Sequence, residues 1–334
     1  MQSHLFLAST PFNVLTATMV ALALPDSDDK QLWLIDQPAS LSPFMQAALV
    51  WSSSPFTSVR LASNKARGLQ QKLRRKALLE TLGRQACELA PSHVYTANDR
   101  RIEFQGIMAA LSHHGQPAVG HYLDDGTYTY TGRKTHWLLD KIIDRQLKRW
   151  LYGGWWQQPD DIGCSGWIQD AHVAFPSLAH PGLQQKHLLP LPASTDHPAL
   201  KQLAQALVDK PKWLEQASLV VVLPHDSVRD AQTEAAMLQL ATTAGGNVVI
   251  KNHPRNAPFA NDSPWAGYQL LPSSIPMEML FPLLPEGAQL CGDVFSALLT
   301  SRWLRPDIEV TSICKQTSEL AEVMEKVGVR LLYC

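Results

Sequence analysis

Two adjacent carboxylates, Asp124 and Asp125, stand directly after an apolar run at 119–123 and directly before Gly126. Parallel α/β sheets place their ligand crevices at the carboxyl ends of such strands. Neighbouring carboxylates repel each other, and burial would raise the pKa of at least one of them. A carboxylate tuned in this way can act as a general base toward an attacking hydroxyl group. The same letters also fit a tight Asp-Asp-Gly turn with a helix cap.

A second polar group, Lys251–Arg255, follows the apolar run at 248–250. A proline restricts the preceding residue to extended backbone, so Pro254 is expected to fix the direction of the His253 ring. Lysine, histidine and arginine within five residues, next to the start of a helix, would form a phosphate-binding corner. The alternative is a charged loop after an edge strand.

A third candidate site residue pair is Gly292 and Ser296, which follow the short apolar run at 289–291. A glycine turn that leads into a helix presents backbone N–H groups, and these suit a phosphate or a ribose, as does the Ser296 hydroxyl. A plain strand–turn–helix connection with Ser296 as the cap explains the same letters.

Short apolar, β-branched runs alternate with helical patterns along most of the chain, which predicts an α/β fold with parallel sheets. Helical patterns include 72–89, 198–208 and 233–243, where apolar residues recur at three- and four-residue spacing. The predicted strands are His4–Ala8, Leu32–Ile35, His93–Thr96, Val119–Leu123, Leu219–Leu223, Asn247–Ile250, Tyr268–Leu271 and Gln289–Cys291.

The length of 334 residues predicts two domains rather than a single core. The alternation breaks between about 153 and 198, a stretch rich in tryptophan, proline, glycine and glutamine. We therefore expect Rossmann-like domains over 1–195 and 196–334, the first with the carboxylate pair and the second with His253.

Composition excludes several classes of function. A net charge of −1 gives no overall attraction to nucleic acid, and no run is long and apolar enough to span a membrane. The five cysteines are scattered and odd in number, which favours reduced thiols in the cytoplasm over a disulfide framework. The apolar N-terminus lacks a basic n-region, so we interpret it as a strand and a helix rather than a signal peptide.

The segment 134–156 combines an amphipathic basic helical pattern with two terminal tryptophans, Trp155 and Trp156. Such a helix can lie in a membrane interface, which would place the protein peripherally on the inner face of the cytoplasmic membrane. The alternative is a helix that packs on its own domain and turns its basic face to solvent.

In combination, these elements resemble the bacterial sialyltransferases, in particular the lipooligosaccharide sialyltransferases and the related polysialyltransferases. The resemblance rests on four pieces in the same order as in those families. The pieces are the opening Ser9-Thr10-Pro11-Phe12-Asn13, then Asp124-Asp125-Gly126-Thr127, then Lys251-x-His253-Pro254, and last Phe295-Ser296-Ala297-Leu298, which departs at Phe295 from the usual serine.

The resemblance implies a GT-B enzyme, with two Rossmann-like domains that face a central cleft, and inverting transfer of a sialic-acid-like sugar from a CMP donor to a glycan hydroxyl. One carboxylate of the pair would be the general base, and motif position favours Asp124 over Asp125. His253 would contact the leaving phosphate. The implied donor-binding residues are Thr10, Asn13, Lys251, Pro254, Gly292 and Ser296.

We expect neither a cofactor nor a metal. The histidines and cysteines show no metal-ligand spacing, and we identify no Asp-x-Asp motif of the kind that holds a nucleoside diphosphate through a divalent cation. Alternatives stay open: the same fold with CMP-Kdo, CMP-legionaminic or CMP-pseudaminic acid, a nucleotide-sugar epimerase or hydrolase, or a membrane-surface scaffold.

Overall fold

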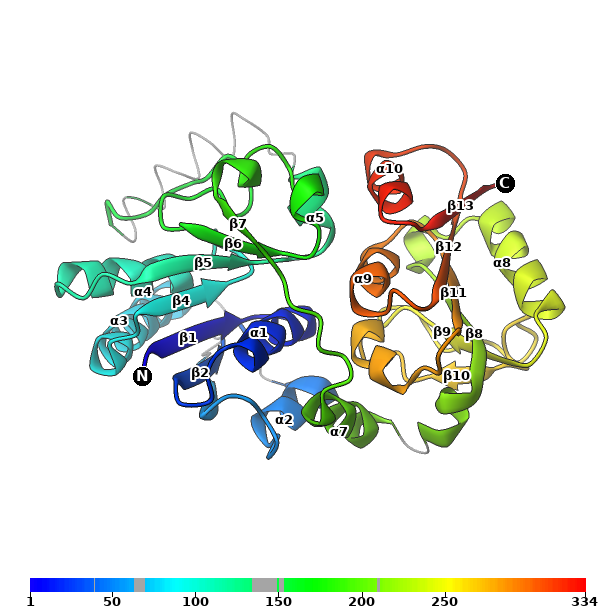
Figure 1. Cartoon of the computed structure of the whole chain (residues 1–334), viewed down its shortest axis with the longest axis horizontal. Helices are drawn as coiled ribbons and strands as arrows, with labels where there is room; N and C mark the ends of the chain where they lie inside the picture. The colour runs from blue at the N-terminus through cyan, green and yellow to red at the C-terminus, as the bar shows by residue number, and fades with distance from the viewer. Residues whose placement is uncertain (39, 63–69, 134–148, 150–152, 209–210) are drawn as a thin grey trace. The chain divides into compact units, whose positions relative to one another are not determined.

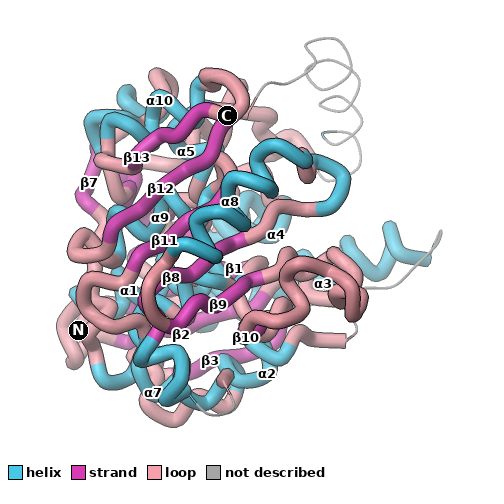
Figure 2. The backbone as a smooth tube through the Cα atoms, turned by 90° about the vertical axis from the view of Figure 1, so that its right-hand side faces the viewer, coloured by secondary structure: helices cyan, strands magenta, loops and turns pink. Residues whose placement is uncertain are grey.

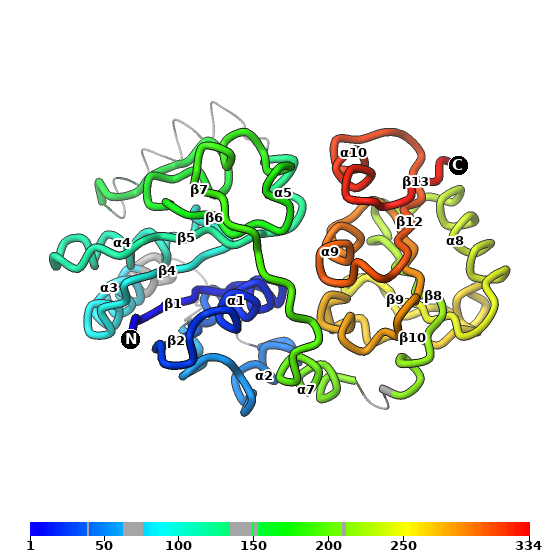
Figure 3. Tube along the Cα trace, in the orientation of Figure 1, coloured from blue at the N-terminus to red at the C-terminus, as the bar shows by residue number. Residues whose placement is uncertain are grey.

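The computed structural model describes residues 1–334 except 39, 63–69, 134–148, 150–152 and 209–210 (Figure 1). The chain forms two compact units, Met1–Pro192 and Ala193–Cys334. Figure 3 traces the chain from β7 (His187–Pro190) of the first unit into α7 (Pro198–Leu207) of the second. Each unit is an α/β domain with its own sheet, as the alternation of apolar runs predicts.

The N-terminal unit is built on a seven-stranded sheet of order β3-β2-β1-β4-β5-β6-β7, in which every neighbouring pair is parallel. The chain winds outward in one direction from β1 and then in the other direction from β4, so the strand order reverses between these two strands. The strands are β1 Ser3–Ala8, β2 Asp29–Leu34, β3 Ser58–Leu61, β4 His93–Thr96, β5 Val119–Leu123, β6 Asp170–Val173 and β7 His187–Pro190.

Helices α3 and α4 cover one face of this sheet. Leu82 of α3 and Phe104 of α4 join Leu5 and Val94 of the strands in one buried cluster. The helices pack closely, since a Cβ added at Gly83 of α3 would lie 2.9 Å from Cβ of Ala110 in α4. The helices of this unit are α1 Pro11–Ala23, α2 Pro43–Leu49, α3 Gln70–Leu89, α4 Ile102–His113 and α5 Thr127–Thr131.

The C-terminal unit has a six-stranded parallel sheet of order β10-β9-β8-β11-β12-β13, whose order reverses between β8 and β11 (Figure 2). Leu219, Ile250 and Trp265 belong to its buried core. Its strands are β8 Ala217–Val222, β9 Asn247–Lys251, β10 Gln269–Leu271, β11 Gln289–Gly292, β12 Glu309–Cys314 and β13 Arg330–Tyr333; its helices are α7 Pro198–Leu207, α8 Ala231–Thr243, α9 Ser296–Leu304 and α10 Glu319–Lys326.

All eight predicted strands are present, with small shifts at their ends, and the N-terminal strand and helix are confirmed as β1 and α1. Five strands were not predicted: β3, β6, β7, β12 and β13. Two of them, β6 and β7, correct the interpretation of 153–198 as a break in the alternation. Both are four residues long and carry a polar residue at their start (Asp170 and His187), so they give no apolar run.

The predicted basic amphipathic helix at 134–156 lies mostly outside the described residues, and its contact with a membrane stays a prediction. Trp156, the last residue of this segment, is buried in the N-terminal unit. Among the helices that the structure describes, none has the length and apolar character needed to span a bilayer.

Candidate active site

The turns after β1 and β5 meet at the carboxyl edge of the N-terminal sheet, across the reversal of strand order. Thr10 caps α1, because its hydroxyl accepts a hydrogen bond from the Asn13 backbone N–H at 3.2 Å. The Asn13 side-chain amide then donates to Oδ1 of Asp125 at 3.0 Å. The structure therefore brings two predicted site residues, Thr10 and Asn13, together with a third, Asp125, which lies 112 positions after Asn13.

Asp124 is a buried structural carboxylate, only 2% exposed. Its Oδ1 accepts from the Gly126 backbone N–H at 2.8 Å, and its Oδ2 accepts from the Ala174 backbone N–H at 3.0 Å. The Tyr130 hydroxyl also donates to Oδ2. Burial raises the pKa of Asp124, while these three hydrogen bonds act in the opposite direction. With both oxygens engaged, Asp124 joins the turn after β5 to the segment after β6.

Asp125 has a different environment although it is the next residue. It is partly exposed, and its carboxylate accepts one side-chain hydrogen bond, from Asn13. Loss of water around the carboxylate raises its pKa to about 7; the charge of Asp124 acts in the same direction, and the Asn13 amide, Arg101 and Arg133 oppose it. A carboxyl group that titrates near neutral pH can accept a proton from a hydroxyl.

The turn that separates the two carboxylates from α5 requires a glycine. Gly126 has φ +78° and ψ −131°, a backbone conformation that L-residues rarely adopt. It holds the cap position of α5 and has no side chain to form a cap hydrogen bond; the Asp124 carboxylate accepts from the N–H of Gly126 itself, and the Asp125 carboxylate accepts from Asn13. The Asp-Asp-Gly turn is thus present, but the helix cap of the alternative interpretation is absent at α5.

Arg101 is a site residue that the sequence analysis missed. It follows β4, and its guanidinium pairs with Asp36 after β2 and donates to Oγ of Ser9 at 3.3 Å. Its positive charge also lowers the pKa of Asp125. The polar run Asn98–Arg101 directly after an apolar strand is the same signal that pointed to Asp125, and it could have identified this residue.

In the C-terminal unit, His253 is the second residue after β9. Its Nδ1 accepts from the Arg255 backbone N–H at 3.2 Å, which places the proton of the neutral ring on Nε2. Burial lowers the pKa of His253, and the neighbouring His225, Arg255 and Lys251 lower it further. His253 therefore offers a neutral N–H donor, held in direction by the turn that Pro254 allows.

Lys251 is buried and positions the neighbouring loops instead of facing solvent. The residue is 4% exposed, and its ammonium donates to the carbonyl oxygens of Ser273 at 2.9 Å and Asn252 at 3.3 Å. Burial lowers the pKa of Lys251 to about 8, and the nearby Glu278 partly offsets this. Glu278, which the sequence analysis missed because no apolar strand precedes it, accepts from the Thr300 hydroxyl at 3.4 Å.

The turn after β11 brings Gly292 close to the strand next to it. A Cβ at Gly292 would lie 2.8 Å from the Val222 carbonyl oxygen and 2.6 Å from the Phe295 ring. Ser296 is the first residue of α9, and Phe295 holds the cap position with no side-chain hydrogen bond. The interpretation of Ser296 as the cap is therefore wrong, and its hydroxyl lies at the helix start, where anions are favoured.

The expectation that the sequence has no Asp-x-Asp motif is wrong, because such a triplet occurs at Asp26-Ser27-Asp28. It lies in the loop before β2, at the amino edge of the sheet and away from the strand ends that carry the site. Asp28 accepts from the Gln2 backbone N–H at 2.8 Å and contacts His4 at 3.4 Å. These contacts give Asp28 a structural role at the amino ends of β1 and β2.

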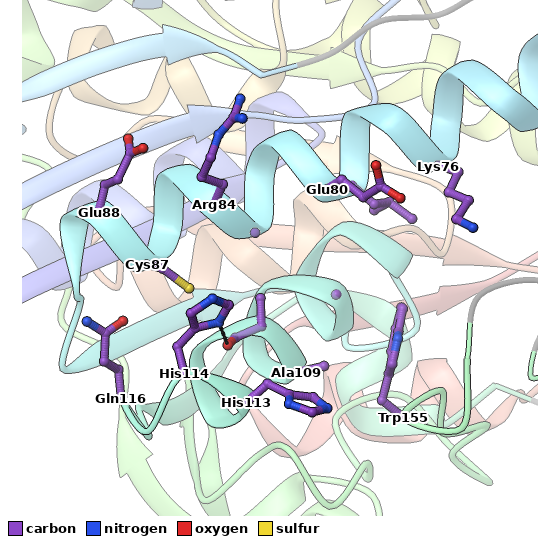
Figure 4. Close-up of a pocket in the computed structure, with 14 residues that line it drawn as sticks. Lys76, Glu80, Arg84, Cys87, Glu88, Ala109, His113, His114, Gln116 and Trp155 are labelled. Atoms are coloured by element: carbon purple, nitrogen blue, oxygen red, sulfur yellow. Dashed lines mark hydrogen bonds between the residues drawn. The ribbon is translucent and has the colours of Figure 1, made fainter.

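A cavity of about 840 Å³ lies between α3 and α4, away from the candidate residues (Figure 4). Cys87 lies toward one end of it and Trp155 toward the other. None of the residues that line it belongs to the turns after β1, β5, β8, β9 or β11, so it is separate from both parts of the candidate site.

No family model matches the chain, and no curated protein matches it. Solved structures match over nearly all of it. An α/β-galactoside α-2,3-sialyltransferase from Photobacterium phosphoreum is 13% identical, with a TM-score of 0.60 and coverage of 99% of this chain and 97% of the other. The GT-B domain of a Photobacterium damselae sialyltransferase is 11% identical, with a TM-score of 0.56 and complete coverage of both chains.

A second group of solved structures has the same build but another named activity. A UDP-GlcNAc 2-epimerase from Neisseria meningitidis is 13% identical, with a TM-score of 0.54 and coverage of 99% of this chain and 88% of the other. At such identities the likeness establishes the fold alone. The chain has the GT-B fold, which confirms the fold class that the sequence predicted, and it resembles bacterial sialyltransferases in that fold.

Proposed function

We propose that the protein is an inverting glycosyltransferase that moves a sialic-acid-like sugar from its CMP donor to a hydroxyl group of a glycan. The observation that carries the proposal is Asp125, a partly exposed carboxyl with a pKa of about 7 at the carboxyl edge of a GT-B N-terminal sheet. The named activities of two structural neighbours support it, as do the four sequence motifs.

In this proposal Asp125, rather than the Asp124 that motif position favours, is the general base. The acceptor oxygen forms a bond to the anomeric carbon, and its proton passes to the Asp125 carboxylate. The bond from that carbon to the donor phosphate breaks, and its electron pair stays on the phosphate oxygen of CMP. Asp124 holds the turn in place, because its own oxygens are engaged by Gly126, Tyr130 and Ala174.

The C-terminal unit supplies the contacts to the leaving group. The N–H of His253 donates to the phosphate, and the start of α9 with the Ser296 hydroxyl binds the phosphate or the ribose. Lys251 acts through the loop that it holds, since its ammonium is bonded to two backbone carbonyls. Thr10 positions Asn13, and Asn13 positions Asp125.

We also propose that the reaction needs no metal ion and no cofactor. A nucleoside monophosphate leaving group carries less total negative charge than a nucleoside diphosphate, and neutral N–H donors with a helix start can stabilise it. The proposal leaves the sugar open among sialic, legionaminic and pseudaminic acids and Kdo, because these residues address the nucleotide and the acceptor hydroxyl. A galactoside is the first acceptor to test, given the named activity of one neighbour.

The test is thermal-shift measurement with CMP, UMP, UDP, GDP and ADP, each with and without EDTA. A ligand at about 100 times its Kd stabilises the folded state by about 2.7 kcal/mol, which is readily measured. We expect stabilisation by CMP that EDTA does not change. Stabilisation by UDP in preference to CMP would contradict the proposal and favour an epimerase or a UDP-sugar transferase.

A further inference from the structure

A second histidine, His225, lies beside His253. It follows β8, the strand next to β9, and the ladder continues past the strand end through the Leu223 N–H and the Lys251 carbonyl oxygen at 2.9 Å. The ring centroids of His225 and His253 are 5.0 Å apart, with their planes at 83°. Both side chains are half-buried, so each ring keeps access to solvent.

Asn256 connects the two turns that carry these rings. Its side-chain amide donates to the Pro224 carbonyl oxygen at 2.9 Å and to Oδ1 of Asn252 at 2.8 Å. Its own Oδ1 accepts from the Asp226 backbone N–H at 2.9 Å. The residues directly before and after His225 are thus tied to the loop of His253, which fixes the spacing of the pair.

In both rings Nδ1 accepts a hydrogen bond from the chain, which leaves Nε2 available to a ligand. Nδ1 of His225 lies 2.7 Å from the Ser227 hydroxyl, which can donate to it, and accepts from the Ser227 backbone N–H at 3.1 Å, as Nδ1 of His253 accepts from that of Arg255 at 3.2 Å. A backbone N–H only donates, so each neutral ring carries its proton on Nε2. Within the described part of the chain, neither Nε2 has a hydrogen-bond partner.

The electrostatic surroundings also suit an anion. The carboxylate of Asp226, next to His225, pairs with Arg229 at 3.4 Å, so its charge is partly neutralised. β8 is the strand at which the order of the C-terminal sheet reverses, and the turn with Ser296 follows β11 on its other side. His225 therefore lies at the switch point, where open α/β sheets bind ligands.

We propose that His225 and His253 form a two-imidazole contact for the phosphate of a nucleoside monophosphate, each donating its Nε2–H to a phosphate oxygen. This inference rests on the proposed function and adds His225 to the leaving-group contacts. The donor phosphate carries one negative charge as a diester and gains another as CMP leaves. A second N–H group that donates to the phosphate therefore stabilises the transition state more than it stabilises the bound CMP-sugar.

The test compares CMP with cytidine, which lacks the phosphate, by calorimetric titration of the parent, His225→Ala, His253→Ala and the double variant. A hydrogen bond to a charged group predicts a loss of roughly tenfold in CMP affinity for each single variant, with cytidine affinity unchanged. His225→Gln keeps an N–H donor and should recover part of the loss. His113→Ala, an exposed histidine far from β8 in sequence, is the control.

A His225→Ala variant that retains the parental ratio of CMP to cytidine affinity would overturn the two-histidine contact and leave the proposed function standing. Circular dichroism and thermal melting show whether each variant is folded. If the parent itself bound no CMP, the proposed function would fail. Titration with inorganic phosphate would then decide whether the two histidines bind a phosphate group. Shifts of the His225 and His253 ring signals by NMR support the pair, and unchanged signals overturn it.

Discussion

Neighbouring residues with the same side chain have different chemical states in the turn after β5. The Asp124 carboxylate is buried and accepts three hydrogen bonds, whereas the Asp125 carboxylate is partly exposed and accepts one, from the side-chain amide of Asn13. General-base catalysis contributes about 10²–10⁴-fold, so Asp125→Asn should lower kcat by that order while CMP affinity stays within about twofold. Steady-state kinetics and CMP titration check this.

Asp124→Asn should instead show its effect in stability. Its amide nitrogen would face donors that now meet a carboxylate oxygen, at a cost of roughly 1–3 kcal/mol in the free energy of unfolding. Urea unfolding of the two Asn variants side by side is the measurement. If Asp124→Asn were as stable as the parent and abolished turnover, the two assignments would have to be exchanged.

The acceptor-dependent rate should also follow the titration of Asp125. The base must be deprotonated, so kcat/KM should rise with pH through about 7 and level off above it. The Asn13 hydrogen bond lowers the pKa of Asp125, so Asn13→Ala should move the rising limb to higher pH. A limb that stays in place in Asn13→Ala would show that another group titrates.

At the scale of the element, the turn before α5 depends on a backbone conformation open to glycine. Gly126→Ala should strain this turn by about 1–3 kcal/mol and displace Asp125, so both stability and turnover should fall. Gly115 is the matched control, because it also has positive φ (+71°) and nothing within 4 Å of an added Cβ. Gly115→Ala should therefore lose stability and keep its turnover.

The elements themselves were predictable where they carry apolar runs. The central strands β1, β4, β5, β8 and β9 are almost entirely buried, and buried parallel strands appear in sequence as short apolar runs. β7 and β13 are edge strands with exposed residues at both ends, and β6 begins with Asp170, whose carboxylate contacts His187 at 2.9 Å. These three strands form because they pair with neighbouring strands, and the sequence does not reveal that pairing.

The candidate site was predictable as motifs but not as a network. Asp125, His253 and Ser296 follow apolar runs and could be found from their position alone. The Asn13–Asp125 hydrogen bond and the Arg101–Asp36 pair join strands that are distant in sequence, so only the strand order brings them together. The difference between Asp124 and Asp125 likewise depends on Ala174 and Tyr130, which no local pattern connects to them.

At the scale of the whole molecule, a row of histidines across the N-terminal sheet should couple folding to pH. His93 Nδ1 lies 2.9 Å from His121 Nε2, and His121 Nδ1 lies 3.2 Å from His172 Nε2. Burial lowers the pKa of His121 to about 2 and that of His172 to about 4, and it also lowers those of His4 and His93. The folded state therefore keeps these rings neutral.

The sign of the pH effect follows from these lowered values. Below about pH 6.5 these histidines bind protons in the unfolded chain but stay neutral in the folded chain. Their contribution to the free energy of unfolding, present at pH 8, is therefore lost as the pH falls. From pH 8 to pH 5, His121 alone should cost about 2 kcal/mol. Asp125, whose pKa is raised to about 7, acts in the opposite direction over the same range, so the measurement compares the parent with His121→Gln by urea unfolding at both pH values. On going from pH 8 to pH 5 the parent should lose about 2 kcal/mol more than the variant, and an equal change in the two proteins would contradict the prediction.

The proposed reaction is the transfer of a CMP-activated acidic sugar with Asp125 as the base. The most direct measurement incubates the parent and Asp125→Asn with CMP-N-acetylneuraminic acid and a panel of glycan acceptors, and follows CMP release and product by NMR. We predict acceptor-dependent product of inverted anomeric configuration from the parent, without added metal, and about 10²–10⁴-fold slower formation by the variant. Absence of transfer from every CMP-linked nonulosonic acid and Kdo donor, with conversion of UDP-GlcNAc instead, would contradict the account.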